Sequence, residues 1–169
     1  MTGFYLLSNI LKHPKSLMLR PFGIVMGEST LFERIIQGEV PGNFISKGKT
    51  WSAFLDVFPR AEGHTLVVPN RPVQRIADLS TSETTDLFEG LKQVQRILTD
   101  YFKTTDFTVV VHDGPLAGQE IPHVHIHVIP RTEGDNGLAL PAIFPHSSPP
   151  IPPDFEGLRE LCKKILGVE

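Results

Sequence analysis

The alternation of apolar and polar positions is most regular over residues 122–131. Three histidines occupy every second position of this stretch: His123, His125 and His127. The residues between and after them are apolar and β-branched: Val124, Ile126, Val128 and Ile129. This composition at a period of two predicts a strand. Because successive side chains of a strand point to opposite faces, we expect the three imidazoles to share one face while the apolar side chains enter a core.

A period of three to four residues predicts helices in two other segments. Thr30 and Glu33 have the spacing of a capping box and predict a short N-terminal helix, which Gly38 ends. Ser80 and Glu83 repeat that spacing before the longest helix. The apolar stripe of this helix has steps of three and four: Leu87, Leu91, Val94, Leu98 and Tyr101.

Short apolar runs bounded by turn residues predict the remaining strands. They cover residues 43–46, 51–57, 64–68 and 107–112, and the first two are joined by a hairpin turn at 47–49. Together with the histidine strand, they predict an α+β fold in which one long helix packs across an antiparallel sheet.

Composition divides the 169 residues into three parts. Residues 28–131 carry the predicted helices and strands and form one domain. Residues 1–27 are an extension that contains Lys12, Lys15 and Arg20 but no acidic residue. Residues 132–169 form a Pro-rich tail with six of the 15 prolines within 141–153, followed by a short helix that Asp154 caps.

Charge and cysteine content exclude several classes of protein. A net charge of −3 gives no reason to expect nucleic acid as a partner, and no apolar run is long enough to predict a membrane span. Cys162 is the only cysteine, so no internal disulfide forms. These features favour the cytoplasm, and the basic, acid-poor extension at 1–27 makes a mitochondrial presequence the alternative.

A row of imidazoles supports two kinds of chemistry. One is a metal-dependent hydrolase, in which His64 or His112 would add to the ligands from the row. The other is covalent catalysis at phosphorus, in which one imidazole attacks and its neighbours hold phosphoryl oxygens.

The alternating histidine motif resembles the signature of the histidine triad (HIT) superfamily of nucleotide hydrolases and transferases. Residues 113–131 resemble its fragile-histidine-triad branch, which cleaves dinucleoside polyphosphates, whereas residues 31–41, 53–56 and 63–69 resemble the branch that hydrolyses adenosine phosphoramidates. The resemblance implies a HIT-like antiparallel sheet in a two-fold dimer and cleavage at the α-phosphate of adenine nucleotides. A nucleotide-binding signalling module with weak turnover is an alternative.

The resemblance also assigns roles to the histidines. It implies that His125 is the nucleophile and forms a nucleotidyl-histidine intermediate. We expect His127 to stabilise a phosphate or leaving-group oxygen, and His123 to fix the His125 tautomer through its backbone carbonyl. His64 is a structural residue near the site that would pair with His123. No cofactor is required and no metal ligand is expected, although a divalent metal could enter with the substrate phosphates.

The remaining candidates would bind the nucleotide. The resemblance implies that Asp56 accepts the ribose hydroxyls. An apolar slot for the base would be lined by Phe32, Ile35, Phe54, Leu55 and Val57. Gly118 and Gln119 belong to a Gly-rich turn that would approach the phosphates. His112 and Glu120 depart from the family pattern, and we expect His112 to bond phosphate and Glu120 to point away from it.

The sequence predicts a homodimer for two further reasons. Phe88, Ile97 and Phe102 lie off the apolar stripe of the long helix, and one small sheet cannot cover them all. The histidine strand comes last in the domain and could form a sheet edge that a partner extends. A Cys pair that binds structural zinc in some relatives is replaced by Thr30 and Glu33, so that zinc site is absent.

Overall fold

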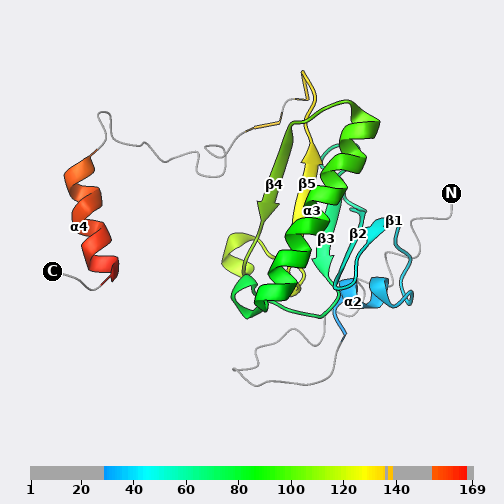
Figure 1. The fold of residues 1–169 in the computed structure, drawn as a ribbon, viewed down its shortest axis with the longest axis horizontal. Helices are drawn as coiled ribbons and strands as arrows, with labels where there is room; N and C mark the ends of the chain where they lie inside the picture. The colour runs from blue at the N-terminus through cyan, green and yellow to red at the C-terminus, as the bar shows by residue number, and fades with distance from the viewer. Residues whose placement is uncertain (1–28, 136, 139–153, 167–169) are drawn as a thin grey trace.

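A computed structural model describes residues 29–135, 137–138 and 154–166. Its centre is a five-stranded antiparallel sheet in the order β1-β2-β3-β5-β4 (Figure 1). The strands are β1 (Phe44–Lys47), β2 (Trp51–Leu55), β3 (Thr65–Pro69), β4 (Phe107–Val111) and β5 (Ile126–Pro130). The helices are α2 (Leu31–Ile36), α3 (Thr81–Phe102) and α4 (Phe155–Leu166), with 3-10 turns at Ile76–Asp78 and Pro115–Ala117. The predicted α+β class and antiparallel sheet are confirmed.

The long helix α3 covers one face of the sheet (Figure 1). Ser80 and Glu83 form the reciprocal capping box that the sequence predicts. The buried residues of the helix pack on the sheet: Leu87, Leu91, Val94 and Leu98. Two predictions about the helix were wrong, since Tyr101 is 72% exposed at its last turn and Phe102 packs against the core.

A glycine lets α3 approach the sheet closely. Gly90 lies over the indole of Trp51, and a Cβ at this position would be 2.5 Å from a ring atom. Trp51 is buried in the core cluster on β2, so the ring has little room to move. The separation of helix and sheet is therefore set by the absence of a side chain at Gly90.

The short helix α2 packs on the opposite face of the sheet. Thr30 caps it, because its Oγ1 accepts a hydrogen bond from the Glu33 N–H at 3.1 Å. A second apolar cluster joins the helix to β2 and β3: Phe32, Ile35, Phe54, Leu66 and Val68. The side chain of His127 lies on this face, because Leu66 pairs with His127 in the register of β3 and β5.

The histidine segment differs from the prediction in two ways. The ladder of β5 begins only at Ile126, because the Val124 N–H donates to Val73 O instead of a neighbouring strand. Val124, Ile126 and Val128 still enter the core, as predicted. The expected edge position was wrong: β5 lies between β3 and β4, and the edge strands are β1 and β4. The order of the strands along the chain does not reveal the central position of β5, because β5 pairs between two strands that come before it in the sequence.

Outside the sheet, the cap predicted for the last helix is present. Asp154 caps α4, because its Oδ1 accepts the Gly157 N–H at 2.9 Å. Residues 1–27 and most of the Pro-rich segment lie outside the described residues.

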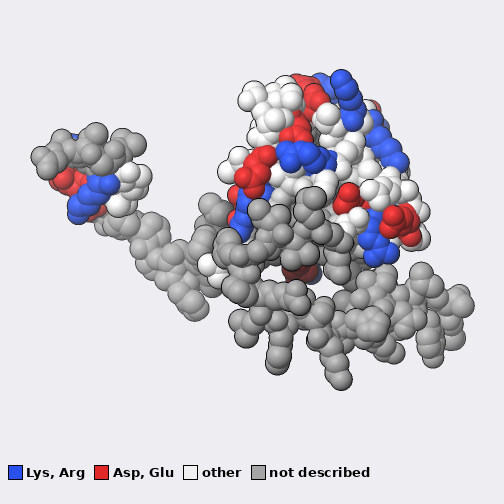
Figure 2. All heavy atoms as spheres, turned by 90° about the horizontal axis from the view of Figure 1, so that it is seen from below, with Lys and Arg blue, Asp and Glu red and all other residues white. Residues whose placement is uncertain are grey.

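In the part of the chain that the structure describes, no helix is long and apolar enough to cross a membrane. On the part of the described surface that Figure 2 shows, acidic and basic side chains lie intermingled, in keeping with the small net charge.

Replacing Gly90 with Ala should destabilise the fold. Alanine improves helix propensity by about 1 kcal/mol, but its methyl group would overlap the buried Trp51 ring, and overpacking costs about 1–3 kcal/mol. We expect a net loss of up to about 2 kcal/mol in urea unfolding. Thr85→Ala on the exposed face of α3 is the control and should change stability by less than about 0.5 kcal/mol. A stabilised Gly90→Ala variant would show that helix and sheet are not in close contact here.

Candidate active site

A cleft of about 300 Å³ opens on the face of the sheet opposite α3. Its lining includes residues from β3, β4 and β5 with side chains on this face: Leu66, Val110, His127 and Ile129. The remaining lining residues come from α2 and the connecting loops: Phe32, Asp56, Phe58, Arg60, His64, His112, Gly118, Glu120, Ile121 and His125. Four of the seven histidines therefore meet at one cleft.

One ring nitrogen of His125 makes a hydrogen bond to the backbone, and the other is available for chemistry. Its Nδ1 lies 2.7 Å from His123 O, and a carbonyl oxygen can only accept, so Nδ1 carries the proton. The Nε2 atom of the neutral ring then holds an unshared electron pair. The edge of the Phe32 ring packs at 5.1 Å between centroids and fixes the imidazole plane. This is the contact through which the sequence predicted that His123 fixes the His125 tautomer.

His123 is wholly buried and organises its surroundings. Its Nε2–H donates to Pro69 O at 2.8 Å, so Nδ1 accepts, and the Thr30 hydroxyl donates to it at 2.7 Å. The expected pairing of His123 with His64 was wrong. The residue at the position of a zinc-binding Cys in some relatives, Thr30, instead links the start of α2 to the histidine segment.

His64 pairs with His127 instead. The Arg60 N–H donates to His64 Nδ1 at 3.2 Å, so this ring carries its proton on Nε2. Nε2 lies 2.9 Å from His127 Nδ1 and donates to it. The proton of neutral His127 is thereby placed on its Nε2. His125 and His127 have ring centroids 4.9 Å apart, so a lone pair and an N–H donor lie side by side.

Burial keeps these rings neutral. It is the main cause that lowers the pKa values of His64, His123 and His125 below 6.5, although the His123 carbonyl partly opposes the change at His125. Burial, followed by the neighbouring imidazoles, lowers the pKa of His127 to about 4. At neutral pH each ring is therefore the uncharged tautomer that its hydrogen bonds select.

Asp56 closes a turn and also lines the cleft. Its Oδ1 accepts the Phe58 N–H at 2.9 Å, as in a turn-initiating Asp. Its Oδ2 lies 3.5 Å from His64 Nδ1 and 4.0 Å from His127 Nδ1, and the carboxylate lines the cleft. The turn therefore holds a carboxylate at the cleft wall.

Only part of the expected base slot reaches the cleft. Phe32 lines it, whereas Ile35 and Phe54 are buried in the apolar cluster beside α2. Leu55 and Val57 do not line it, and Val57 is 63% exposed. Phe58 and Arg60 also line the cleft but were not predicted from the sequence, because neither belongs to a periodic segment. The one indication in the sequence was their position between Asp56 and His64, two predicted site residues.

The Gly-rich turn contributes in a different way from the expected one. Gly118 lines the cleft with a φ of +94°, a conformation that favours glycine, and its carbonyl accepts from His112 Nδ1 at 3.3 Å. Gln119 is buried outside the cleft lining and donates to Gln74 O at 2.9 Å, so its predicted amide contact with phosphate is unsupported. Glu120 lines the cleft, contrary to the expectation that it points away.

Lowering the pH from 6.5 to 4 should destabilise the protein. The unfolded chain binds protons at its histidines near pH 6.5, whereas folded His127 does so only near pH 4. The unfolded state therefore holds more protons in this window, and the free energy of unfolding rises with pH. Histidine NMR signals should give a midpoint near 4 for His127, and His127→Gln should flatten the pH dependence of stability. A midpoint near 6.5 would contradict the buried, neutral ring.

Comparison with known proteins identifies the family. Residues 37–134 match the model of the HIT domain. The adenosine 5'-monophosphoramidase of Saccharomyces cerevisiae is 31% identical over 136 residues, which cover 80% of each chain. The bis(5'-nucleosyl)-tetraphosphatase [asymmetrical] of Schizosaccharomyces pombe is 42% identical over 87 residues, 52% of this chain and 48% of the relative.

A solved structure agrees with these matches. The histidine triad nucleotide-binding protein of Candida albicans superposes with a TM-score of 0.68 at 27% identity, covering 82% of this chain and 96% of that one. The chain spans about half the length, or less, of several curated relatives that it matches. The family model nevertheless covers more than half of this chain and includes all of the triad, so the chain belongs to the HIT domain family.

Proposed function

We propose that this protein is a nucleotide hydrolase or transferase that cleaves at the α-phosphate of adenine nucleotides. One observation carries the proposal: the unshared pair of His125 Nε2 lies beside the His127 Nε2–H at an open cleft. A nucleophile next to a hydrogen-bond donor is what displacement at phosphorus requires. The names of the matched relatives, a tetraphosphatase and a phosphoramidase, support the same class of reaction.

The proposed reaction has two displacements. His125 Nε2 attacks the α-phosphorus, the bond to the leaving group breaks, and a nucleotidyl-histidine forms. The Nδ1 proton stays in its hydrogen bond to His123 O and shares the positive charge that develops on the ring. His127 Nε2–H donates a hydrogen bond to the oxygen that gains negative charge. Water then attacks the intermediate and releases the nucleoside monophosphate, whereas another acceptor would give transfer.

The nucleoside would lie towards Asp56 and Phe32. The Asp56 carboxylate can accept two ribose hydroxyls, since its side chain is 15% exposed and lines the cleft. Phe32 offers an apolar surface next to His125. His112 and Gly118 lie on the side of the cleft formed by the Gly-rich turn, where phosphate oxygens would be bound.

Two features favour dinucleoside polyphosphates as substrates. Neutral His127 donates a hydrogen bond without a full proton transfer, which suits a phosphate leaving group that departs as an anion. Arg60 also brings a cation to the cleft lining. Phosphoramidates, whose amine leaving group needs a proton, are the second candidate because of the S. cerevisiae relative. The reaction as written requires no cofactor, although a divalent metal could accompany the phosphates. Cytoplasmic or mitochondrial residence stays a prediction.

A covalent intermediate tests the proposal directly. Brief reaction with α-³²P-labelled diadenosine triphosphate, quenched in base, should leave acid-labile label on the peptide that contains His125. His125→Asn should retain nucleotide binding but lower kcat by a factor of about 10³ or more, because the nucleophile is lost. Steady-state kcat/KM for diadenosine triphosphate, diadenosine tetraphosphate and an adenosine phosphoramidate should rank the two polyphosphates first.

Other outcomes would separate the alternatives. Unchanged turnover in His125→Asn would show that His125 is not the nucleophile. Binding with negligible turnover of all three substrates by the native protein would favour a signalling module. Turnover that disappears with a chelator and returns with metal would favour a metal-dependent hydrolase.

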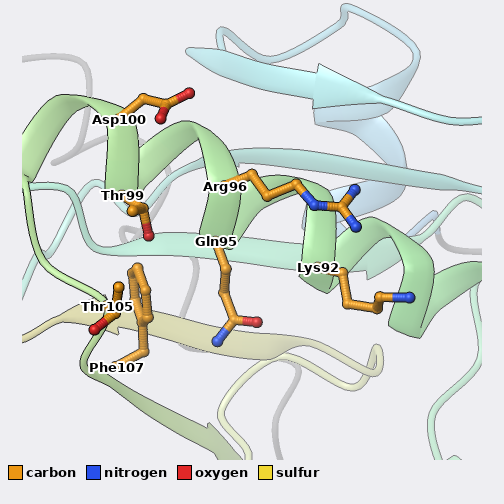
Figure 3. A pocket seen from close by; sticks show the side chains of 7 residues that line it. All are labelled: Lys92, Gln95, Arg96, Thr99, Asp100, Thr105 and Phe107. Atoms are coloured by element: carbon orange, nitrogen blue, oxygen red, sulfur yellow. The ribbon is translucent and has the colours of Figure 1, made fainter.

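We infer that two copies pair through the flank of α3 that faces β4. A groove of about 550 Å³ lies there, and Figure 3 shows side chains of α3 around it with Thr105 and Phe107 opposite. Phe88, Lys92, Gln95 and Thr99 follow a helical stripe along this flank, and Phe88 is 56% exposed. β4 adds an unpaired edge with Val109 41% exposed. An exposed apolar flank beside a sheet edge suits a two-fold interface.

Phe88→Glu should shift this dimer towards monomer, because it would bury a charge at the interface. Light scattering at micromolar protein should give twice the monomer mass for the native chain and a lower mass for the variant. Ile97→Gln is the matched control. Ile97 follows Phe88 by about two and a half turns, so it lies on the opposite side of α3, and it is 36% exposed; the dimer should persist. A native chain that is monomeric at micromolar concentration would refute the interface.

A further inference from the structure

Part of the cleft floor has no role in the proposed mechanism. Leu66 and Val110 flank His127 on the neighbouring strands and share its face of the sheet, because both pair with His127. Leu66 belongs to the apolar cluster that contains Phe32, on the side where the reacting nucleoside would lie. Among the described residues, Val110 and Ile129 belong to neither apolar core cluster, although both line the cleft. The cleft therefore extends past His127 over an outer floor formed by Val110 and Ile129.

The loop between β2 and β3 brings an aromatic ring and a cation to the same cleft. Phe58 lines the cleft and is 63% exposed, so most of its ring surface is not packed against the protein. Arg60 also lines the cleft, and its guanidinium makes no hydrogen bond or ion pair within the described part of the chain. A guanidinium without an anionic partner at the wall of a cleft suits an anionic ligand.

Hydrogen bonds to the site itself fix the backbone of this loop. The Phe58 N–H donates to Asp56 Oδ1 at 2.9 Å, and the Arg60 N–H donates to His64 Nδ1 at 3.2 Å. His64 directly precedes β3, which pairs with β5, so the loop ends beside the strand that carries Ile129. Phe58 and Arg60 are therefore held next to the histidines and the outer floor.

We propose that the outer floor, Phe58 and Arg60 form a subsite for the leaving nucleotide of a dinucleoside polyphosphate. When His125 Nε2 bonds to the α-phosphorus, the oxygen that bridges to the next phosphate departs with its electron pair, and the second nucleotide leaves as an anion. Arg60 binds the phosphates of this nucleotide, and Phe58 stacks against its base above the outer floor. This inference rests on the proposed nucleotide hydrolysis and extends it to the second half of the substrate.

The composition of the subsite distinguishes two kinds of leaving group. A leaving nucleotide carries a base that can stack on an aromatic ring and phosphates that can pair with a guanidinium. The ammonia that leaves an adenosine phosphoramidate has neither a base nor a phosphate. Phe58 and Arg60 therefore raise kcat/KM for dinucleoside polyphosphates and do not act on the phosphoramidate.

A matched pair of substrates tests the contact with the second base. Diadenosine triphosphate and the γ-methyl ester of ATP carry the same phosphate chain and the same charge, but only the first has a second nucleoside. Phe58→Ala should lower kcat/KM for diadenosine triphosphate about tenfold or more, as expected when base stacking is lost, and leave the methyl ester within about twofold. Phe58→Tyr keeps an aromatic ring and should retain the native preference for diadenosine triphosphate.

Arg60→Gln tests the contact with the leaving phosphates. It should lower kcat/KM for diadenosine triphosphate and for the methyl ester by the same factor, at least about tenfold, because both leaving groups carry phosphates. An adenosine phosphoramidate should stay within about twofold of the native value. Glu62→Gln is the control, since it changes the charge of the same loop at an exposed residue outside the cleft lining, and it should leave all three substrates unchanged.

The outcomes separate the subsite from the proposed function. An equal loss for diadenosine triphosphate and the methyl ester in Phe58→Ala would show that Phe58 contacts the reacting nucleoside, and would overturn the subsite. Unchanged kinetics in Phe58→Ala, or an equal loss of all three substrates in Arg60→Gln, would overturn it too, with circular dichroism showing that each variant is folded. The proposed hydrolysis would stand in each case. A native protein that hydrolyses none of the three substrates would instead remove the proposed function, and the subsite with it.

Discussion

The chemistry of the cleft depends on main-chain groups whose hydrogen-bonding roles cannot change. A carbonyl oxygen only accepts and an amide N–H only donates, so each one selects a histidine tautomer. Two carbonyls act on the triad segment, Pro69 O on His123 and His123 O on His125, while the Arg60 N–H acts on His64 and through it on His127. Because burial disfavours protonation of these rings, the selected neutral forms persist at pH 7. A lone pair and a donor are thus fixed although, within the described part of the chain, no charged residue makes a hydrogen bond to either ring.

Strand order explains why these backbone groups are available. β5 lies between β3 and β4, which brings the end of β3, and with it Pro69 O, next to the segment that leads into β5. The same insertion places His64, at the start of β3, beside His127. An edge position for β5 would have left one side of the triad without strands to supply these partners. Burial of the histidines and control of their tautomers therefore have one structural cause.

Local sequence predicted what local interactions determine. The Ser80 capping box, the buried stripe of α3 and the inward direction of Val124, Ile126 and Val128 follow from period and end signals within a few residues. Partners distant in the chain could not be predicted this way: Gln119 is held by Gln74, and His64 by His127. The position of β5 within the sheet also depends on distant pairing. The sequence predicted that His125, His127 and Asp56 would line the cleft. It predicted the apolar wall least well, because the local sequence around an apolar residue does not show whether its side chain faces a cleft or the core.

The first described helix shows how fold and site depend on each other. A six-residue helix is too short to be stable alone, so α2 relies on its cap and its buried side chains. Its cap is Thr30, whose oxygen accepts from the Glu33 N–H while its hydroxyl proton goes to His123. Its buried Phe32 packs against the rings of both His123 and His125. The same helix that packs on β2 and β3 through its apolar cluster thus also contacts the triad, so a shift of α2 would move the imidazole of the proposed nucleophile.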